Sequence, residues 1–430
     1  MRSLGRRGVR FVALAVLALL TAPAAEARVY SFEPVKTPHS YASAATLKFR
    51  VGRLAGTEIH SARLRLGGAG HSVPVRKVRG AARRGVLRLR ARAKRGRAKL
   101  RVVAFCRPAF GTFRAGHWPS ACWRPYSARS PFNKAIPGNP RLLSDSGAIV
   151  RRMVGWGEPY IQPAGVAGTD RDWNHPTYYS QPGDPVFTLD CTQWCHQGVD
   201  GDRIRIPDRA RPAGGGDAHM TVVDQDGKWE YSFWHVTSKA KGGGRLSFEE
   251  GGRGRLDGTG LGYGPTAGQF GTLAGIVRGP ELLAGRINHA LFLTIDCSNG
   301  RAVYPAGRNS GAACSQTEGA PPMGARLQLA MSDAQIDSLS MPAWKAAILK
   351  ALARYGAYVG DTGGSPWDIA VESGSTYTSF GVEDPLVTLG KRGGRAIDAD
   401  NGVYYMNVGS GVDWGRYLRV IDPCVTRGSC

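Results

Sequence analysis

Residues 217–236 show the most regular alternation of apolar and polar positions in the chain, on both sides of Asp226-Gly227. Side chains two positions apart along a strand share a face, so this pattern predicts two strands joined by a tight turn, with Gly227 in the positive φ region that such a turn requires. One face of the second strand would carry a row of rings, namely Trp229, Tyr231, Phe233 and His235. We expect this β-hairpin to form the centre of the main domain.

Alternation of the same kind predicts further strands, and a change of period predicts helices. The strands are expected at residues 286–296, 325–331, 357–360 and 367–372 and within 404–422, and a short helix at 144–154. Ser332 and Gln335 form the S-x-x-Q pattern of a helix start, and Pro342 begins a second helix that ends at Gly356. We therefore predict a mainly β main domain, a large antiparallel jelly-roll-like β-sandwich with a two-helix insertion.

Residues 28–105 are expected to form a separate, smaller domain. Apolar residues alternate with Arg or Lys in five segments, at residues 45–51, 62–66, 73–78, 86–91 and 98–104. Short strands of this kind, separated by turns, are typical of a small immunoglobulin-like β-sandwich.

The positive charge of the chain is concentrated in this basic module. Of the formal net charge of +24, residues 29–105 contribute nineteen Lys and Arg against two acids, whereas residues 106–430 hold 33 basic and 30 acidic residues. The outward basic positions either form a solvated face or hold an anionic polymer, and such an attraction would be sensitive to salt. The strands lack the stacking aromatics of a single-stranded nucleic-acid groove, so we expect no specific nucleic-acid partner.

The first 27 residues have the composition of a secretory signal peptide. Four arginines precede an apolar run at residues 11–20, and Ala25-Glu26-Ala27 is a small-residue pattern that places cleavage before Arg28. A membrane anchor is the alternative, but the run is shorter than the about 20 residues that span a bilayer. We expect a secreted, extracellular protein without a membrane span, in which a linker at residues 106–140 joins the basic module to a main domain at 141–430.

The chain contains eight cysteines, and an even number in an exported protein favours disulfides. They group into sequence-local pairs: Cys106 with Cys122, Cys191 with Cys195, Cys297 with Cys314, and Cys424 with Cys430. Half of a zinc site at Cys191, Cys195 and His196 is the alternative, but no second Cys/His pair with matching spacing occurs in the sequence. We expect no metal and no cofactor.

The sequence has no P-loop, no G-x-S-x-G motif, no H-E-x-x-H motif and no paired C-x-x-C, which argues against NTPases, common serine esterases and zincin proteases. The remaining polar residues suit two chemistries. A polysaccharide lyase needs a cation or an amide to neutralise a uronate carboxylate, and a His or Tyr base to remove the adjacent proton. Those groups would be Arg326 and Gln328 on one strand face, together with His219, His289 or Tyr231.

A glycoside hydrolase instead needs two carboxyl groups on either side of the scissile bond. Asp361 would be one, and Asp368 or Glu372 the other. The expected substrate-binding residues are His235, Trp229, Gln328 and Asp368. Simpler roles compete with these: Asp361 as the cap of a turn, His289 as a hydrogen-bonded core residue and Arg326 as a structural partner of a carboxylate.

Four motifs carry a resemblance to known proteins. They are Gly216-Asp217-Ala218-His219-Met220, Gly285-Arg286-Ile287-Asn288-His289-Ala290-Leu291, Pro322-Met323-Gly324-Ala325-Arg326-Leu327, and Ala353-Arg354-Tyr355-Gly356 leading to Asp361. Over roughly residues 118–418 the chain resembles a group of secreted soil-bacterial, actinobacterial-type proteins with a β-rich domain and no assigned activity. The resemblance implies export and a shared β-rich domain, but no reaction. Many members of the group carry Asp where this chain has Asn288, which would impair this protein if that position were a catalytic acid.

These observations predict a carbohydrate-active enzyme, either a lyase or a glycoside hydrolase. Its substrate would be an extracellular or cell-wall polysaccharide, which would be anionic if the enzyme is a lyase. Its expected catalytic residues are His219, Tyr231, His289, Arg326 and Asp361. A non-catalytic cell-wall or glycan-binding surface protein is the alternative, and a structural spore or envelope component is a third. Convergence of the catalytic candidates on one open cleft would favour the enzyme, whereas dispersed or buried side chains would favour binding.

Overall fold

The structure is a computed structural model of the chain. It describes residues 28–32, 34–35, 41–51, 58–66, 72–74, 78, 81, 84, 86–93, 98–105, 118–119, 121, 123–364 and 367–430. The expected signal peptide, residues 1–27, and the expected pair Cys106–Cys122 lie outside the described residues. Among the residues described, no helix combines the length and the apolar character needed to cross a bilayer.

The described part of the basic module consists of short strands in two sheets. The strands are β1 (Arg28–Phe32), β2 (Tyr41–Arg50), β3 (Glu58–Leu66), β4 (Ser72–Pro74), β5 (Val86–Ala93) and β6 (Ala98–Phe105). One sheet has the order β1-β6-β3-β4, and β2 pairs with β5 in the other. Both sheets contribute to one core, which includes Leu47, Phe49, Leu64, Leu87, Leu100 and Val102. All five predicted strands are present; β1 was not predicted, and the immunoglobulin-like arrangement remains a prediction.

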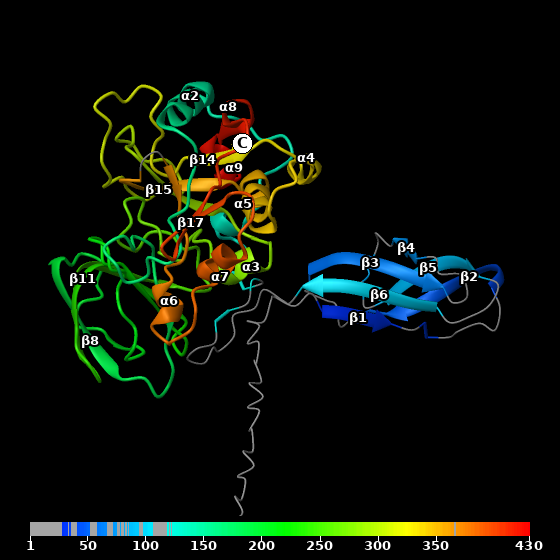
Figure 1. Cartoon of the computed structure of the whole chain (residues 1–430), viewed down its shortest axis with the longest axis horizontal. Helices are drawn as coiled ribbons and strands as arrows, with labels where there is room; N and C mark the ends of the chain where they lie inside the picture. Colours follow the sequence, from blue (N-terminus) through cyan, green and yellow to red (C-terminus); the bar gives the residue numbers. More distant parts are fainter. Residues whose placement is uncertain are drawn as a thin grey trace, which may run out of the picture.

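Two larger sheets form the frame of the main domain (Figure 1). The first has the order β7-β10-β11-β12-β8-β9. Its strands are β7 (Thr177–Tyr179), β8 (Val186–Trp194), β9 (Arg203–Arg205), β10 (Met220–Asp224), β11 (Trp229–Lys239) and β12 (Gly244–Arg255). The second has the order β16-β13-β15-β14-β19. Its strands are β13 (Leu291–Ile295), β14 (Arg326–Leu329), β15 (Ala357–Thr362), β16 (Trp367–Ile369) and β19 (Leu418–Ile421), while β17 (Ile397–Asp400) and β18 (Val403–Met406) pair with each other.

The main domain is mainly β, as predicted, but its sheets are mixed. The structure is 32% strand and 18% helix, which confirms the fold class at this level. However, β7 pairs with β10, β8 with β12, and β13 with β15 in parallel. The prediction of purely antiparallel sheets was therefore wrong. Parallel pairs require crossover connections, which the local alternation of residues does not reveal.

Helices lie before, between and after the strands of the main domain. They are α2 (Ser146–Trp156), α3 (Gly279–Leu283), α4 (Asp333–Ser338), α5 (Ala343–Arg354), α6 (Ser375–Thr378), α7 (Pro385–Arg392), α8 (Trp414–Tyr417) and α9 (Pro423–Arg427). The predicted two-helix insertion is α4 and α5, between β14 and β15. The predicted capping box is also present. The Ser332 hydroxyl accepts a hydrogen bond from the backbone N–H of Gln335, and the side-chain oxygen of Gln335 accepts one from the backbone N–H of Ser332.

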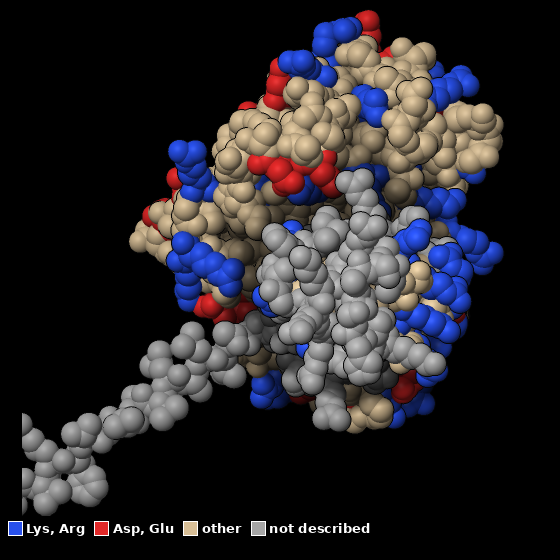
Figure 2. All heavy atoms as spheres, turned by 90° about the vertical axis from the view of Figure 1, so that its right-hand side faces the viewer, with Lys and Arg blue, Asp and Glu red and all other residues tan. Residues whose placement is uncertain are grey.

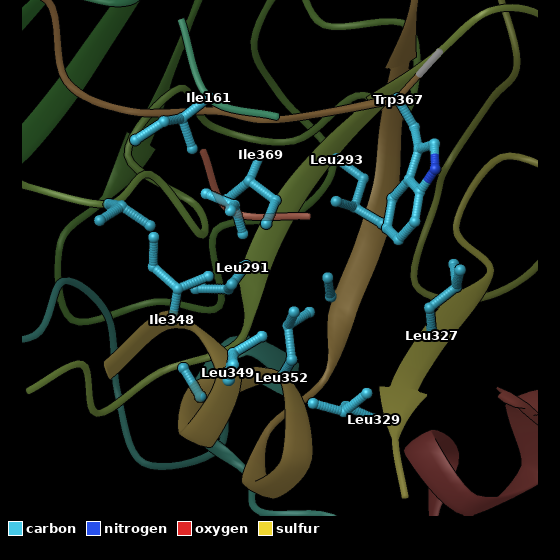
Figure 3. Close-up of a cluster of buried hydrophobic side chains, with 14 of the residues drawn as sticks. Ile161, Leu291, Leu293, Leu327, Leu329, Ile348, Leu349, Leu352, Trp367 and Ile369 are labelled. Atoms are coloured by element: carbon cyan, nitrogen blue, oxygen red, sulfur yellow. The ribbon is translucent and has the colours of Figure 1, made fainter. Parts of the chain in front are cut away.

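The five-stranded sheet is buried on both faces. On one face, Leu291, Leu293 and Ile369 pack in one core with Ile348 and Leu352 of α5 (Figure 3). On the other face, the alternate residues Phe292, Tyr358 and Ala370 join a second core, which Val223 of β10 also enters. This second face therefore points toward the six-stranded sheet.

The predicted hairpin is present as β10 and β11, which pair in antiparallel register from Met220 with Phe233 to Asp224 with Trp229. The residue with positive φ in its turn is Lys228, at 57°, rather than Gly227. A Cβ at position 227 would lie 2.4 Å from Asp224 Oδ2, so a larger residue there would force the Asp224 side chain to move.

The segment expected to link the two domains packs on the main domain where it is described. Trp123, Tyr126 and Phe132 are buried in the second core, together with Phe270 and Tyr358. Phe132 lies in the short 3-10 helix η2 (Pro131–Asn133). From Trp123 onward the chain therefore belongs physically to the main domain.

Candidate functional site

A cavity of about 850 Å³ is lined by residues from both sheets of the main domain. The six-stranded sheet contributes Trp194, Trp234 and Glu250, and the five-stranded sheet contributes Phe292, Thr294, Asp361, Thr362 and Asp368. Loops complete the wall with Tyr160, Trp173, His175, Asp217, His219 and Arg308. Three of the predicted site residues, His219, Asp361 and Asp368, therefore share one cavity.

Strand register places Asp361 and Asp368 on either side of Thr294. Thr294 of β13 is the register partner of Asp361 on β15 and of Asp368 on β16. Neighbouring strands lie about 4.8 Å apart, so the Cα atoms of the two aspartates are separated by about 10 Å. All three side chains line the cavity.

Both carboxyl groups hold their protons more tightly than exposed aspartates do. Burial raises the pKa of Asp368 to about 8. Burial also raises the pKa of Asp361 to about 7, and the charge of Asp217 adds to this, although backbone N–H groups of Thr362 and Ala267 donate to the Asp361 carboxyl at 2.8 and 3.2 Å. The Oδ1 atom of Asp368 has no hydrogen-bond partner among the described residues. A buried carboxyl without a partner at a cavity wall is free to bind a ligand.

Two imidazoles in close contact, tilted by 49° to each other, line the same cavity as this pair of acids. The rings of His175 and His219 have centroids 4.1 Å apart. Burial lowers the pKa of His219 to about 4, and burial together with the charge of His219 lowers the pKa of His175 well below its usual value. Both rings are therefore neutral at neutral pH. Asp217 lies 4.0 Å from His219 Nε2 and accepts a hydrogen bond of 3.0 Å from Trp234 Nε1.

Aromatic rings form part of the cavity wall. Trp173 and Trp194 remain 47% and 42% exposed, which is unusual for tryptophan. The rings of Trp194 and Trp234 lie 5.5 Å apart at an angle of 46°. Exposed indole faces in a cavity are suited to stacking against the apolar faces of sugar rings.

Among the described residues that line the cavity, the Lys and Arg residues are represented by Arg308, which is paired with an acid. Arg308 Nη2 lies 2.6 Å from Glu250 Oε1, and Arg308 Nη1 lies 3.2 Å from His196 Nε2. The other charged residues that line the cavity are acids. The cavity therefore offers no unpaired cation to a bound carboxylate.

Three of the predicted catalytic residues lie outside this cavity. Arg326 is buried, donates to the carbonyls of Tyr355 and Lys134, and sits 5.0 Å from the centre of the Tyr358 ring. His289 bonds to Glu281 at 3.1 Å and to the Ala290 carbonyl. Tyr231 packs against Phe233 in the core on the opposite face of the six-stranded sheet. The expected convergence of these residues with His219 is not found, because each is held by structural partners.

The remaining candidates also have partners elsewhere. His235 lies 2.7 Å from Glu249, and Trp229 is covered by Arg253 and Arg255. Gln328 donates to the Ala353 carbonyl and accepts from Arg419. Glu372 lies outside the cavity, where it accepts a 2.6 Å bond from the Tyr377 hydroxyl. The choice of Asp368 as the partner of Asp361 is thus the one that the cavity supports.

Asn288 also lies away from the cavity, where its side chain accepts from Arg286 Nε at 2.9 Å. An acid at this position would not belong to the site described above. Sequence reasoning missed His175, Asp217, Trp234 and Arg308 as site residues. Two of these residues had a signal in the sequence. Asp217 lies in the same motif as His219, and the alternation correctly placed Trp234 on the opposite face of its strand from Tyr231.

Three of the predicted disulfides are present: Cys191–Cys195, Cys297–Cys314 and Cys424–Cys430. The Cys191–Cys195 bond removes both thiolates that the zinc alternative required. In the part of the chain that the structure describes, no group of three or more His, Cys, Asp or Glu side chains has an arrangement that would hold a metal ion.

The cavity therefore combines two acids with raised pKa values, neutral imidazoles and exposed indole rings in one open space. Comparison with protein-family models, with curated proteins and with solved structures finds no match to this chain.

Proposed function

We propose that the protein is a secreted glycoside hydrolase that cleaves an uncharged extracellular polysaccharide, with Asp368 as proton donor and Asp361 as base. The observation that carries the proposal is the placement of these two aspartates on either side of Thr294 in one cavity. Hydrolysis of a glycosidic bond by acid–base catalysis needs two such carboxyl groups. The three disulfides agree with an oxidising, extracellular environment.

The two pKa values divide the roles. A group with a pKa of about 8 remains protonated at neutral pH and can donate, whereas the lower value of about 7 at Asp361 leaves a substantial ionised fraction that can accept. The two values define a working range between about pH 7 and 8. At the midpoint of this range most Asp361 is ionised and most Asp368 is still protonated, whereas at either limit one of the two groups is half titrated.

In the proposed step, water attacks the anomeric carbon as the bond from that carbon to the glycosidic oxygen breaks. The carboxylate of Asp361 takes a proton from the water, and Asp368 gives its proton to the departing oxygen. Solvent then restores both carboxyl groups. Because one strand, carrying Thr294, lies between the two aspartates, we expect the wider carboxyl separation of inverting enzymes, about 6.5–9.5 Å, which leaves room for the water.

Asp217 and His219 are expected to position the substrate in this step. Asp217 is fixed by the indole N–H of Trp234, and its charge already contributes to the raised pKa of Asp361. Neutral His219 offers a ring nitrogen to sugar hydroxyl groups. Trp173 and Trp194 would stack against neighbouring sugar units.

The charges of the cavity favour an uncharged substrate over a uronate polymer. The guanidinium of Arg308 is occupied by Glu250, and the lyase neutraliser expected from the sequence, Arg326, is buried elsewhere. A uronate would therefore meet acids without an unpaired cation. This is why we favour hydrolysis over the lyase reaction.

A non-catalytic glycan-binding protein is the second candidate, and the exposed rings of Trp173 and Trp194 favour it. Binding by stacking does not require the two buried acids. The candidates therefore differ in what they predict for variants of Asp368: loss of turnover in the enzyme, and unchanged glycan retention in the binding protein.

The test is incubation of the purified full-length protein with neutral and uronate polysaccharides, followed by measurement of new reducing ends and of unsaturated products. We expect reducing ends from a neutral polymer and a 10²–10⁴-fold lower rate for Asp368→Asn, the range found for general acids. Glu372→Gln is the matched control, because Glu372 is also buried with a pKa raised to about 7 but lies outside the cavity. Unsaturated products from a uronate polymer, or equal rates for wild type and Asp368→Asn, would overturn the assignment.

A further inference from the structure

The outer faces of the basic module carry cations in register across neighbouring strands. On β2, the exposed residues Lys48 and Arg50 alternate with the buried residues Leu47 and Phe49. On β5, Arg88 and Arg90 are exposed in the same way. The alternation places all four cations on the face of this sheet that points away from the core.

The register brings like charges directly opposite each other in both sheets. Lys48 pairs with Arg88 across β2 and β5, and Arg65 pairs with Lys99 across β3 and β6. All four side chains are exposed. Directly opposed like charges destabilise a sheet. Because both sheets contain such pairs, the module is destabilised by a repulsion that a surface with mixed charges would not have.

Acids do not compensate for these cations in the described part of the chain. Lys48, Arg50, Arg88 and Arg90 form no ion pair with any described residue. Solvated faces normally mix both signs of charge, but residues 29–105 contain nineteen Lys and Arg against two acids. In the view of Figure 2, Lys and Arg side chains lie along the right-hand side of the grey atoms, and a group of acidic side chains lies above them.

We propose that these faces of the module bind a linear anionic polysaccharide, independently of the cavity in the main domain. Cations recur about 5 Å apart across strands and about 7 Å apart along a strand, so an extended chain with regularly spaced charges can meet several of them at once. The attraction is electrostatic and of long range, and it displaces counterions from the polymer.

Nucleic acid is the less favoured ligand because the faces provide no stacking surface. Among the strand positions of the module whose exposure the structure describes, the exposed ones carry no aromatic ring, and Phe32 and Phe49 are buried. Single-strand binding proteins combine a basic groove with aromatic platforms. The module has the first feature without the second.

The test measures binding of the full-length protein to polygalacturonate, to inorganic polyphosphate and to poly(dT) over a range of salt concentrations. The variant replaces Lys48, Arg50, Arg88 and Arg90 by Gln. We expect at least a tenfold loss of affinity for polygalacturonate at low salt and a slope of log affinity against log salt that is smaller by about three, because about 0.7–0.9 counterions are released per cation contact.

The control variant removes the same charge from the main domain through Arg129→Gln, Arg209→Gln, Lys241→Gln and Arg395→Gln, four exposed positions. It should lose less than about threefold, because only the distant field changes. Circular dichroism of both variants checks that they fold. Equal losses for the two variants, or no loss for either, would overturn the proposal.

Binding of poly(dT) much more tightly than polyphosphate of equal charge would reassign the surface to nucleic acid. Neither readout depends on hydrolysis, so a failure here is distinct from a failure of the proposed enzyme activity.

Discussion

The main domain and the basic module treat charge in opposite ways. In the main domain, the fully buried Arg278 and Glu281 lie 2.9 Å apart, and His289 bonds to the same carboxyl group. In the module, exposed Lys48 faces Arg88 and exposed Arg65 faces Lys99, without acids between them. Buried charges must be paired to remain in a low-dielectric interior, whereas exposed like charges persist because water screens them.

Because of this difference, different kinds of residues indicate function in the two regions. In the main domain, the informative groups are carboxyls without a close cation, because burial raises their pKa and prepares them for proton transfer. In the module, no single residue is informative, since its property is a repeated row of cations. We therefore propose that the cavity carries the catalytic activity and that the module retains the protein on a polymer. Variants in one region test one proposal without changing the other region.

The largest expected effect separates the two regions by activity. On a short, soluble, neutral oligosaccharide, Asp368→Asn should lower kcat by 10²–10⁴-fold, because the departing oxygen then receives no proton. The Gln variant at Lys48, Arg50, Arg88 and Arg90 should turn over the same oligosaccharide at the wild-type rate. Steady-state kinetics on both variants measures this. A loss of kcat in the module variant would mean that the regions act as one site.

The next effect concerns the buried charges of the main domain. Glu281→Gln should destabilise the protein by about 3–5 kcal/mol, because it removes the carboxylate that lies 2.9 Å from the buried Arg278 guanidinium. Burial alone would raise the pKa of Glu281, but the charges of Arg278 and His289 outweigh it and lower that pKa. Asp337→Asn, which removes the exposed partner of Lys350, is the matched control and should cost far less. Urea denaturation measures both, and equal costs would show that the Arg278 cluster is not an ion pair of this kind.

Local patterns in the sequence predicted most strands and helices, because alternation and capping are short-range features. The hairpin of β10 and β11, the capping box at Ser332 and the helix after Pro342 are examples that the structure confirms. Parallel pairing of β13 with β15 was not predicted, because it depends on a crossover through α4 and α5 rather than on any local period.

The candidate site was predicted in part, for the same reason. Alternation correctly placed Arg326 and Gln328 on one strand face, but it could not show that backbone carbonyls occupy both. The ring-rich face of β11 with Tyr231 is core, whereas Trp234 on the other face lines the cavity. The meeting of Asp361 with Asp368 around Thr294 required the sheet order, which only the fold supplies.

A smaller effect follows from the raised pKa of Asp368. Its folded value of about 8 exceeds the ordinary value of about 3.9, so the folded state retains a proton that the unfolded state loses between these limits. Stability is therefore fully present at low pH and declines as pH rises toward about 8. Relative to wild type, Asp368→Asn should gain of the order of 1–3 kcal/mol from pH 5 to pH 8, since water in the cavity screens part of the penalty.

The measurement is urea denaturation of wild type and Asp368→Asn at several pH values across this window. Asp337→Asn again serves as the control for the loss of a carboxyl group at an exposed position outside the cavity. If Asp368→Asn runs parallel to wild type, the carboxyl is ionised in the folded protein, and its role as proton donor falls with it.

The smallest expected effect is a gain in stability rather than a loss, and it concerns the basic module. Lys48→Glu would face Arg88 with an opposite charge and should stabilise the β2–β5 pair by about 0.2–1 kcal/mol, while weakening polyanion binding. Thr46→Glu is the matched variant, because Thr46 is exposed and faces Arg90, so it gains a pair without losing a cation. Hydrogen exchange of residues 41–50 and 86–93 in the full-length protein measures the stability, and both variants should slow it. Lys48→Glu changes the charge by two units and Thr46→Glu by one. If the opposed cations are held for polymer binding, Lys48→Glu must lose more affinity per unit of charge than Thr46→Glu. Equal losses per unit would mean that charge at this pair serves only solubility, because the position of the cation in the row would then have no effect on binding.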